Sequence, residues 1–365
     1  MRFLKLGVAA FWFECNAVDG VLWWWGSVWG SIVFDRSVFY CRIGCLMLNG
    51  RYALLTVDTE ALTGRAMSSY VDRLVWGRHA AGTAGIREIC ELGAEFNAPH
   101  VFFADMCGCY AELEHMKKAI RWLSTHGHDV QLHTHPEALP KVFWDQQGLP
   151  AIPRFMNQYR DVARTRFVVQ HFAKLLVEQT GKPVLAHRAG SFRWNALTIW
   201  ALQELNIPLS FNQSMRALES GRGVHGEPDC LPYTWSNGVI EVPVTERWVP
   251  GVPGFRPDRW VSLTYPESPY FKFGSRPIPA WKHPFAPKPA PVTVVLLHSW
   301  SLLERDEAGH AVYRDDRLLE GYRKFLRRLV KDCEVITTAE FLELHAQGKI
   351  DISRTVNLEQ VEAQV

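Results

Sequence analysis

Short apolar runs alternate with longer stretches of helical periodicity from residue 51 onward. The run at 52–57 has the length and composition of a buried strand. The segment 84–96 follows it and repeats apolar residues such as Ile86 and Ile89 on one helical face, which predicts an amphipathic helix. This alternation is typical of repeated strand–helix units around a mostly parallel sheet.

The same two periods predict further elements along the chain. Expected strands lie at 101–103, 129–133, 184–188, 209–211, 240–243 and 292–298, with a last one near 335. Expected helices lie at 111–125, around 167–176, from 195, at 315–332 and from 338. About seven strand–helix units in one domain predict an α/β fold of the barrel type, with its chemistry at the C-terminal ends of the strands.

Residues 1–46 differ from everything after them, because they are rich in Trp, Phe, Val and Gly, poor in charge, and without a strand or helix period. Their apolar run at 21–34 is shorter than the roughly 20 residues that a membrane-spanning helix needs. Glu14 and Cys15 follow the first apolar stretch, where signal-peptide cleavage requires small residues. Because Met47 lies just before the first predicted strand, we interpret 1–46 as an atypical upstream extension from a misplaced start codon, foreign to the domain. A peripheral membrane anchor is the alternative.

The rest of the chain divides by its pattern into a domain at 47–348 and a polar C-terminal tail at 349–365. Residues 250–291 are crowded with Pro, Gly and aromatic side chains, which predicts a long ordered excursion within the domain. We expect a cytoplasmic protein in preference to a periplasmic or secreted one, with any membrane contact confined to 1–46.

Charge and cysteine content narrow the class of protein. The 365 residues carry a formal net charge of +2, which provides no electrostatic footprint for nucleic acid. Eight cysteines are scattered through a chain too long to need disulfide staples, so we expect reduced thiols.

Two carboxylates end the first predicted strand. Asp58 and Glu60 are two residues apart, so they point to the same face if the strand continues. Burying both without a cation would be costly, and a metal ion or an arginine would remove that cost. For an Asp-x-Glu pair alone, the alternative is two solvated loop residues that cap the next element.

Two histidines end the strand expected at 129–133. His133 and His135 share one face within a His-Thr-His-Pro-Glu segment and can offer ring nitrogens to one metal ion. Such a pair is weak evidence by itself. Beside a carboxylate pair it favours a metal site.

Two further strand ends carry polar side chains. Arg188 ends the strand at 184–188 and could hold Asp58 ionised through a bidentate contact. His298 ends the most apolar strand of the chain. A surface arginine and a hydrogen-bonded core histidine are the alternatives. Four strand ends of the same kind favour a catalytic centre over these separate interpretations.

With these residues in view, the sequence resembles the polysaccharide deacetylase family, carbohydrate esterases that include chitin and peptidoglycan deacetylases. The resemblance covers 51 to about 344 and implies a distorted (β/α)7 barrel. It implies Asp58 as catalytic base, Arg188 as the residue that orients it, and His298, in a Leu-x-His segment, as the acid. The ion that it implies is Zn²⁺ or another divalent metal such as Co²⁺, Ni²⁺ or Mn²⁺. The implied metal ligands are Glu60, His133 and His135.

The chain also departs from the family pattern. One residue separates Asp58 from Glu60, whereas the family commonly has two adjacent aspartates. The family's second histidine usually lies four residues after the first; Glu137 occupies that place, so His135 must substitute. The arginine motif usually continues to a proline and an aromatic residue, but 189–192 reads Ala-Gly-Ser-Phe. These changes indicate a divergent branch, in which Glu60 or Glu137 completes the metal site.

The residues and the resemblance together predict a metal-dependent hydrolase that removes acetyl groups from an N- or O-acetylated sugar, polysaccharide or glycan precursor. Asp58 would take a proton from the attacking water, and His298 would give one to the departing amine or alcohol. The alternatives are a small-molecule amidase on the same fold and a non-catalytic glycan-binding protein in polysaccharide biosynthesis. Aromatic residues of the second half could stack on sugar rings or simply pack: Trp235, Trp248, Tyr265, Tyr270, Phe271 and Trp281.

Overall fold

The computed structural model describes residues 4–6, 9–11, 14–18, 21–25, 52–249, 257–272 and 291–362. The chain divides into two compact units, Met1–Cys45 and Leu46–Val365. The first unit holds two antiparallel strand pairs, although its sequence lacks the alternation that predicts strands. Within the described part of the chain, every helix is too short or too polar to span a lipid bilayer. The strand pairs are β1 (Leu4–Leu6) with β2 (Ala9–Phe11), and β3 (Glu14–Val18) with β4 (Val21–Trp25).

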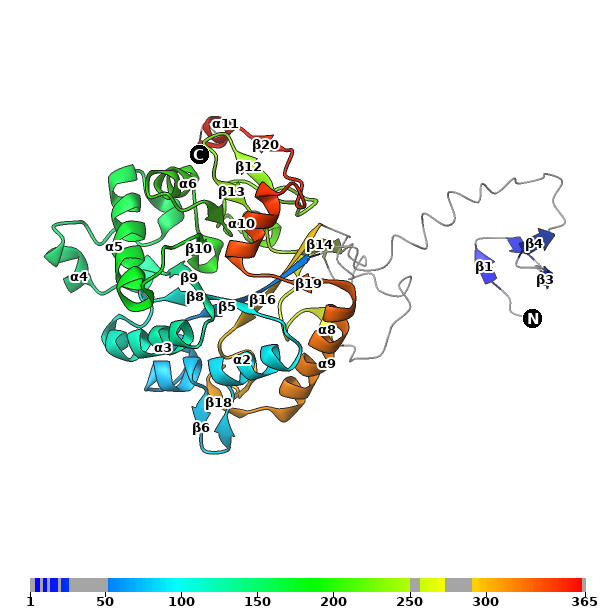
Figure 1. Ribbon diagram of the computed structural model, residues 1–365, viewed down its shortest axis with the longest axis horizontal. Helices are drawn as coiled ribbons and strands as arrows, with labels where there is room; N and C mark the ends of the chain where they lie inside the picture. The colour runs from blue at the N-terminus through cyan, green and yellow to red at the C-terminus, as the bar shows by residue number, and fades with distance from the viewer. Residues whose placement is uncertain are drawn as a thin grey trace. The chain divides into compact units, whose positions relative to one another are not determined.

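The second unit is built on one curled sheet, which Figure 1 shows surrounded by helices. Its central strands are mutually parallel, in the order β16, β5, β8, β9, β10, β11 and β13. This arrangement confirms the predicted α/β fold with a barrel-like sheet. The bounds are β16 (Val292–His298), β5 (Tyr52–Thr59), β8 (His100–Asp105), β9 (Asp129–Thr134), β10 (Ala186–Ala189), β11 (Leu209–Ser210) and β13 (Ile240–Glu241).

The chain beyond β13 returns to the first strand of the sheet. The backbone N–H of Thr245 donates to the carbonyl oxygen of Val294 at 3.3 Å, and the backbone N–H of Val294 donates to Thr245 Oγ1 at 2.8 Å. These bonds connect the segment after β13 with β16, so the curled sheet is partly closed on this side.

Three short strands extend the sheet. β12 (Tyr233–Trp235) runs antiparallel to β13, β20 (Thr355–Val356) lies parallel to β12, and β19 (Glu334–Val335) pairs with the start of β5. The segment 349–365, expected as a polar tail, therefore adds a strand to the domain. Leu358 and Val361 are buried and anchor it, although the segment is polar on average.

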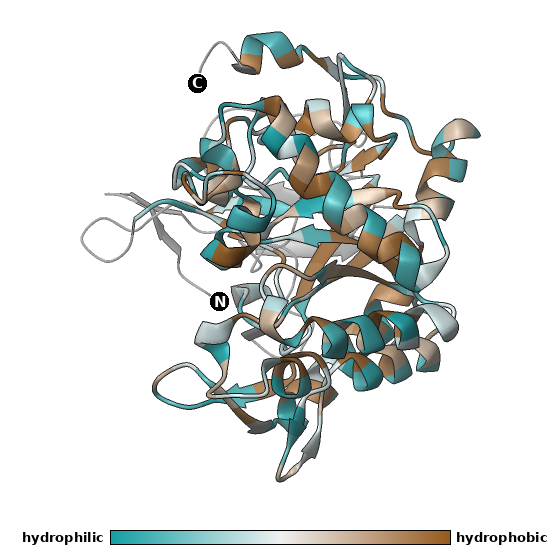
Figure 2. Cartoon of the chain, turned by 90° about the vertical axis from the view of Figure 1, so that its left-hand side faces the viewer, coloured by the Kyte–Doolittle hydropathy of each residue, from teal (hydrophilic) through white to brown (hydrophobic). Residues whose placement is uncertain are grey.

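Helices lie along the sheet with an apolar side turned inward, and Figure 2 shows their hydrophobic and hydrophilic residues on different sides. The two longest begin at side-chain caps, where Asp161 and Asp315 accept from backbone N–H groups in the first turns of α5 and α9. The helices are α2 (Ile86–Glu95), α3 (Leu113–Thr125), α4 (Lys141–Gln146), α5 (Val162–Thr180), α6 (Ala196–Glu204), α7 (Met215–Glu219), α8 (Pro269–Lys272), α9 (Asp316–Asp332), α10 (Thr338–Ala346) and α11 (Leu358–Glu362).

Three hairpins lie outside the main sheet. One of them falls partly in the excursion expected at 250–291, of which 257–272 and Pro291 are described. Trp281 lies outside the described residues. The hairpins are β6 (Arg78–His79) with β7 (Gly82–Thr83), β14 (Glu246–Val249) with β15 (Arg259–Ser262), and β17 (Leu303–Arg305) with β18 (Ala311–Arg314).

Alternation along the strands separates two layers of the core. Leu55 and Val57 of β5 belong to the large apolar cluster that includes the helices. Leu54 belongs to a smaller cluster, made by the opposite faces of the strands together with Phe341 of α10. Asp58 continues this second face, because side chains two residues apart point the same way. The inner face of the sheet thus changes from apolar to polar toward the ends of the strands.

Candidate active site

The polar residues predicted at four strand ends are neighbours in the folded chain. In the parallel register, His298 of β16 lies opposite Asp58 of β5, and Arg188 of β10 lies opposite His133 of β9. The intervening strand β8 ends at Asp105, which lies opposite His133. Strand ends that lie far apart in the sequence therefore meet at one edge of the sheet, as expected for a parallel arrangement.

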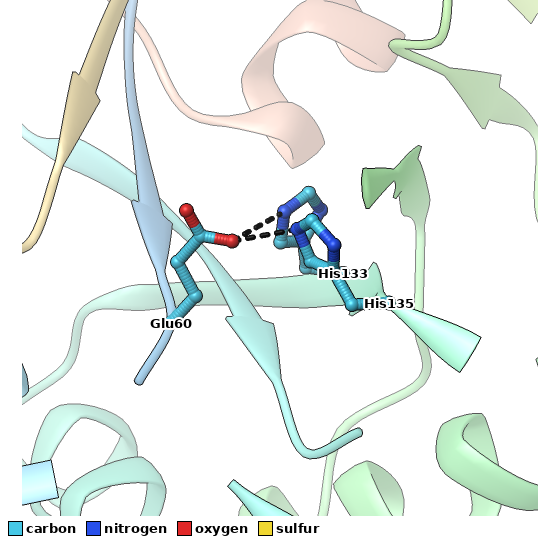
Figure 3. Close-up of side chains that lie close together, drawn as sticks. All are labelled: Glu60, His133 and His135. Carbon is cyan, nitrogen blue, oxygen red and sulfur yellow. Dashed lines mark ion pairs between the residues drawn. The ribbon is translucent and has the colours of Figure 1, made fainter. Parts of the chain in front are cut away.

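Glu60, His133 and His135 form a compact cluster of possible metal ligands, shown in Figure 3. One ligand atom from each lies within 4.8 Å of the others. Glu60 Oε2 is 2.6 Å from His135 Nε2 and 3.5 Å from His133 Nε2. All three residues are buried. The structure thus brings together the three predicted ligands.

The outer nitrogens of both imidazoles are already bonded to acceptors. His133 Nδ1 is 2.8 Å from the carbonyl oxygen of Arg188, and His135 Nδ1 is 2.8 Å from Glu137 Oε1. An acceptor at Nδ1 favours the tautomer that carries its proton there, which leaves the lone pair of Nε2 directed toward Glu60. Two Nε2 lone pairs and a carboxylate oxygen therefore converge on one point.

Glu60 Oε2 is buried without a hydrogen-bond partner among the described side chains and backbone, although both imidazoles are near. Burial by itself raises the pKa of Glu60, but the neighbouring imidazoles, His135 foremost, hold it well below its usual value. Burial lowers the pKa of His135, yet Glu60 and Glu137 outweigh it and raise that pKa well above normal, so a cation that binds to Nε2 would displace a proton there. An unsatisfied carboxylate oxygen beside two imidazoles fits a divalent cation with nitrogen and oxygen ligands.

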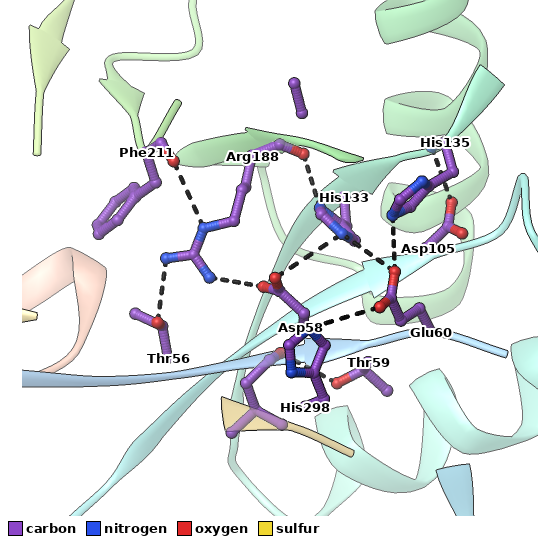
Figure 4. Close-up of polar contacts among 12 residues, drawn as sticks. Thr56, Asp58, Thr59, Glu60, Asp105, His133, His135, Arg188, Phe211 and His298 are labelled. Carbon is purple, nitrogen blue, oxygen red and sulfur yellow. Dashed lines mark hydrogen bonds and ion pairs between the residues drawn. The ribbon is translucent and has the colours of Figure 1, made fainter. Parts of the chain in front are cut away.

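Asp58 is held by a buried arginine, as Figure 4 shows. Arg188 Nη1 donates to Asp58 Oδ1 at 2.5 Å, and Nη2 donates to Thr56 Oγ1 at 3.0 Å. The guanidinium group also lies 4.3 Å from the ring centroid of Phe103. The second carboxylate oxygen of Asp58 is 3.9 Å from His133 Nε2. Arg188 therefore fixes one oxygen of Asp58 and leaves the other directed toward the cluster of predicted ligands.

His298 approaches Oε1 of Glu60, whereas the two other histidines approach Oε2 (Figure 4). Its Nε2 is 3.7 Å from Glu60 Oε1, and its ring stacks on Trp300 with a centroid separation of 4.9 Å. The side chain of His298 is 23% exposed, compared with 6% for Asp58. His298 is thus the most accessible titratable group of the cluster, where a substrate could reach it.

One buried acid of the site was not predicted. Asp105 accepts hydrogen bonds from the backbone N–H groups of Cys107 and Gly108 at 2.9 Å and of His135 at 3.2 Å. Asp105 thus connects the backbone of His135 to the end of β8. The same strand-end signal could have identified it, but the strand was expected to end at residue 103, two residues too early.

Aromatic residues expected as a sugar-stacking wall are mostly part of the core. Trp235 and Tyr265 are buried, and Tyr270 and Phe271 pack against Phe325. The exposed member of the described set is Trp248, at 40%. Of the two alternatives, packing therefore holds for the buried residues Trp235 and Tyr265.

Known proteins were compared with the chain. No family model matches it. No curated protein matches it either. Among solved structures, a protein of Mycobacterium smegmatis described as a polysaccharide deacetylase is 15% identical with a TM-score of 0.46, over 84% of this chain and 94% of that one. A peptidoglycan deacetylase from Bacillus subtilis is 9% identical with a TM-score of 0.37, over 83% of this chain and 95% of that one.

A further similar structure is a mutant of a carbohydrate esterase family 4 pseudoenzyme with restored enzymatic activity. It is 11% identical with a TM-score of 0.37, over 86% of this chain and 68% of that one. All three likenesses have low identity. The function of the chain is inferred below from its own residues.

Proposed function

We propose that this protein is a metal-dependent hydrolase that removes acetyl groups from an N- or O-acetylated sugar, polysaccharide or glycan precursor. The observation that carries the proposal is the convergence of Glu60, His133 and His135 on one point, beside an aspartate held by an arginine and a partly exposed histidine. A metal site with an adjacent base and acid is the arrangement that hydrolysis of an amide or ester needs.

Glu60, His133 and His135 would hold the metal ion. Two imidazole nitrogens and one carboxylate oxygen suit Zn²⁺, and Co²⁺, Ni²⁺ or Mn²⁺ are alternatives with the same ligand types. Such an ion supplies acidity to a water molecule and charge stabilisation to the oxygen of the carbonyl under attack.

Asp58 is positioned to accept the proton of the attacking water. Its Oδ1 is engaged by Arg188, and its Oδ2 faces the cluster at 3.9 Å from His133 Nε2. Because Arg188 is buried and also bonded to Thr56, it keeps the carboxylate in one orientation. Arg188 is therefore a positioning residue for the base.

His298 is positioned to protonate the departing amine or alcohol. Its ring faces the Glu60 oxygen that the other two histidines leave free and is stacked on Trp300, which limits its rotation. Base and acid thus lie at the ends of neighbouring strands, directly opposite each other in the register. For a scissile bond bound near both groups, Asp58 would activate the water that attacks the carbonyl carbon, and His298 would protonate the leaving nitrogen or oxygen.

The test is to purify the full chain, measure its metal content by mass spectrometry, and assay acetate release from acetylated sugars before and after chelation. We expect about one bound ion, activity that chelation removes, and recovery on adding Zn²⁺. His133→Ala should lose both metal and turnover. Activity in that variant equal to wild type would overturn the proposal.

The substrate series separates the related functions. Acetylated oligosaccharides and small linear or cyclic amides are supplied to the same metal-loaded protein. Turnover of the amides alone would identify an amidase. Metal binding without turnover of either class would indicate a glycan-binding protein that lacks catalysis.

A further inference from the structure

Arg193 belongs to a turn that packs on His135, and it has no acidic partner among the described residues. A Cβ atom on Gly190 would lie 2.3 Å from His135 Nδ1, so the turn that begins at Gly190 packs directly on this imidazole. Arg193 closes the turn, because its backbone N–H donates to the carbonyl oxygen of Gly190 at 3.0 Å. Its guanidinium carbon lies 4.0 Å from the ring centroid of Phe155.

Phe155, which lies under Arg193, belongs to a segment that is hydrogen-bonded to Glu137. Arg154, the neighbour of Phe155, donates from Nη2 to the carbonyl oxygen of Glu137 at 2.6 Å. Glu137 is in turn bonded to His135. The segments that carry Arg193 and Phe155 are therefore both in contact with the segment that holds the His135–Glu137 pair.

A second arginine lies beside the first. The carbonyl oxygen of Gly221 accepts from Asn157 Nδ2 at 3.3 Å, and a Cβ atom on Gly223 would lie 3.0 Å from Trp194 Nε1. Arg222 is thus flanked by contacts to the two segments that carry Phe155 and Arg193. Its own Nε donates to Ser220 Oγ at 2.8 Å.

Helix α7 contributes a third positive charge. Arg216 lies in this helix, and the carbonyl oxygen of Ala217 accepts from the backbone N–H of Arg222 at 2.9 Å. Burial lowers the pKa of Arg222, and the neighbouring charges of Arg193 and Arg216 lower it further. Arg193 and Arg216 thus both act on Arg222, in keeping with the contacts between their chain segments.

No carboxylate of the described chain forms an ion pair with any of these three arginines. Glu246 is near, but its oxygens accept from Ser214 Oγ, Ser262 Oγ and the backbone of α7. Glu246 also attracts Arg222, but one buried carboxylate beside three arginines leaves an excess of positive charge near the reaction centre. An oxyanion would relieve their repulsion.

We propose that Arg193, Arg216 and Arg222 form a binding site for a carboxylate or phosphate of the substrate, so that the protein acts on acidic acetylated saccharides. The inference rests on the deacetylase function proposed above. Guanidinium groups suit this task because their paired N–H donors match the oxygens of carboxylate and phosphate. A neutral sugar would leave the three charges unsatisfied.

Binding of sugars without an acetyl group tests the site independently of turnover. We would titrate the metal-loaded full chain with glucuronate, glucose 6-phosphate and glucose, and measure Kd by calorimetry. The two acids should bind more tightly than glucose by about 10- to 100-fold, and Arg193→Gln or Arg222→Gln should remove most of this difference. The better of the two acids identifies the source of the anionic group.

Two further variants control for folding and for general charge. Arg193→Lys keeps the charge and should retain part of the preference. Arg166→Gln removes an exposed arginine of α5, which pairs with Glu204, and should change nothing. Equal affinity of wild type for glucose and both acids, or equal loss in the Arg166 and Arg193 variants, would overturn the proposed site.

An assay of acetate release then tests whether the arginine site affects deacetylation. N-acetylglucosamine 6-phosphate and N-acetylmuramic acid are compared with N-acetylglucosamine in wild type and Arg193→Gln. We expect kcat/KM to fall selectively for the preferred acid, with little change for the neutral sugar, and an equal fall for all three would contradict the site. If the metal-loaded wild type releases acetate from none of these or other acetylated sugars, the deacetylase function fails while the binding result stands.

Discussion

Glu137 bonds to the ring nitrogen of His135 that points away from Glu60, at 2.8 Å from Nδ1. Glu137, four residues after His133, thus supports the predicted ligand His135 from outside the cluster. Glu60 is the carboxylate whose oxygen lies within the ligand group. We infer that Glu60 completes the metal site and that Glu137 orients His135.

Removing this support should weaken metal binding without abolishing it. We expect Glu137→Ala to lower the affinity for Zn²⁺ by about 10- to 100-fold, because His135 loses the acceptor that fixes its tautomer. Glu137→Gln keeps an acceptor oxygen and should lose less. Competition with a chromogenic chelator measures the affinity.

The matched control is Glu114→Ala, which removes an exposed carboxylate of α3 that pairs with Lys117. It should leave the affinity unchanged. A Glu137→Ala protein that binds no metal even at saturating Zn²⁺ would mean that Glu137 is itself a ligand.

Asp58 should be needed for turnover and dispensable for the metal. Asp58→Asn keeps the size of the side chain but cannot accept the proton of the attacking water, so we expect acetate release to fall by about 10²- to 10⁴-fold. Metal content should stay near that of wild type, because the three ligands remain. Loss of the metal together with activity, in a protein whose circular dichroism is unchanged, would instead make Asp58 a ligand.

The ion pair between Arg188 and Asp58 should be important for stability. Both groups are buried, so Arg188→Gln leaves an unpaired carboxylate in the core and should lower the free energy of unfolding by about 3–5 kcal/mol. The double variant with Asp58→Asn should lose less than the sum of the single losses. Urea unfolding measures all three variants.

An exposed pair provides the comparison. Arg166→Gln breaks the contact with Glu204 at the surface and should cost about 1 kcal/mol or less. If the Arg188 and Arg166 variants are equally stable, the buried pair does not contribute to stability as inferred.

His100 should make folding sensitive to acid. It is buried with Nε2 2.7 Å from the hydroxyl oxygen of Tyr322, and burial, with some repulsion from His128, lowers its pKa to about 3. Unfolded, it has a pKa near 6.5, so below that pH the unfolded chain binds a proton that the folded chain does not. Stability contributed by neutral His100 is therefore lost as the pH falls from about 6.5 toward 3.

The expected loss at pH 5 is about 2 kcal/mol relative to neutral pH. His100→Gln removes this titration, so its free energy of unfolding should fall less between pH 7.5 and pH 5. Urea unfolding at both pH values gives the comparison. The same pH dependence in wild type and variant would show that His100 is not the responsible group.

Local periodicity was sufficient to predict much of the site. Asp58 and Glu60 share a face because side chains alternate along a strand, and the same rule joins His133 with His135. The predicted strand at 292–298 coincides with β16 and ends at His298 as expected. Each of these relations lies within one strand, so neighbouring residues determine it.

The distances between residues on different strands could be known only from the folded structure. The register of five strand ends and the curl of the sheet place Glu60 within the ligand group and Glu137 outside it, bury Trp235, and bring Arg193 beside Arg222. No local pattern encodes these distances, because they depend on how segments separated by many residues pack together. The sequence by itself therefore determined which side chains stand at the ends of the strands, and tertiary packing decided which atoms they present to one another.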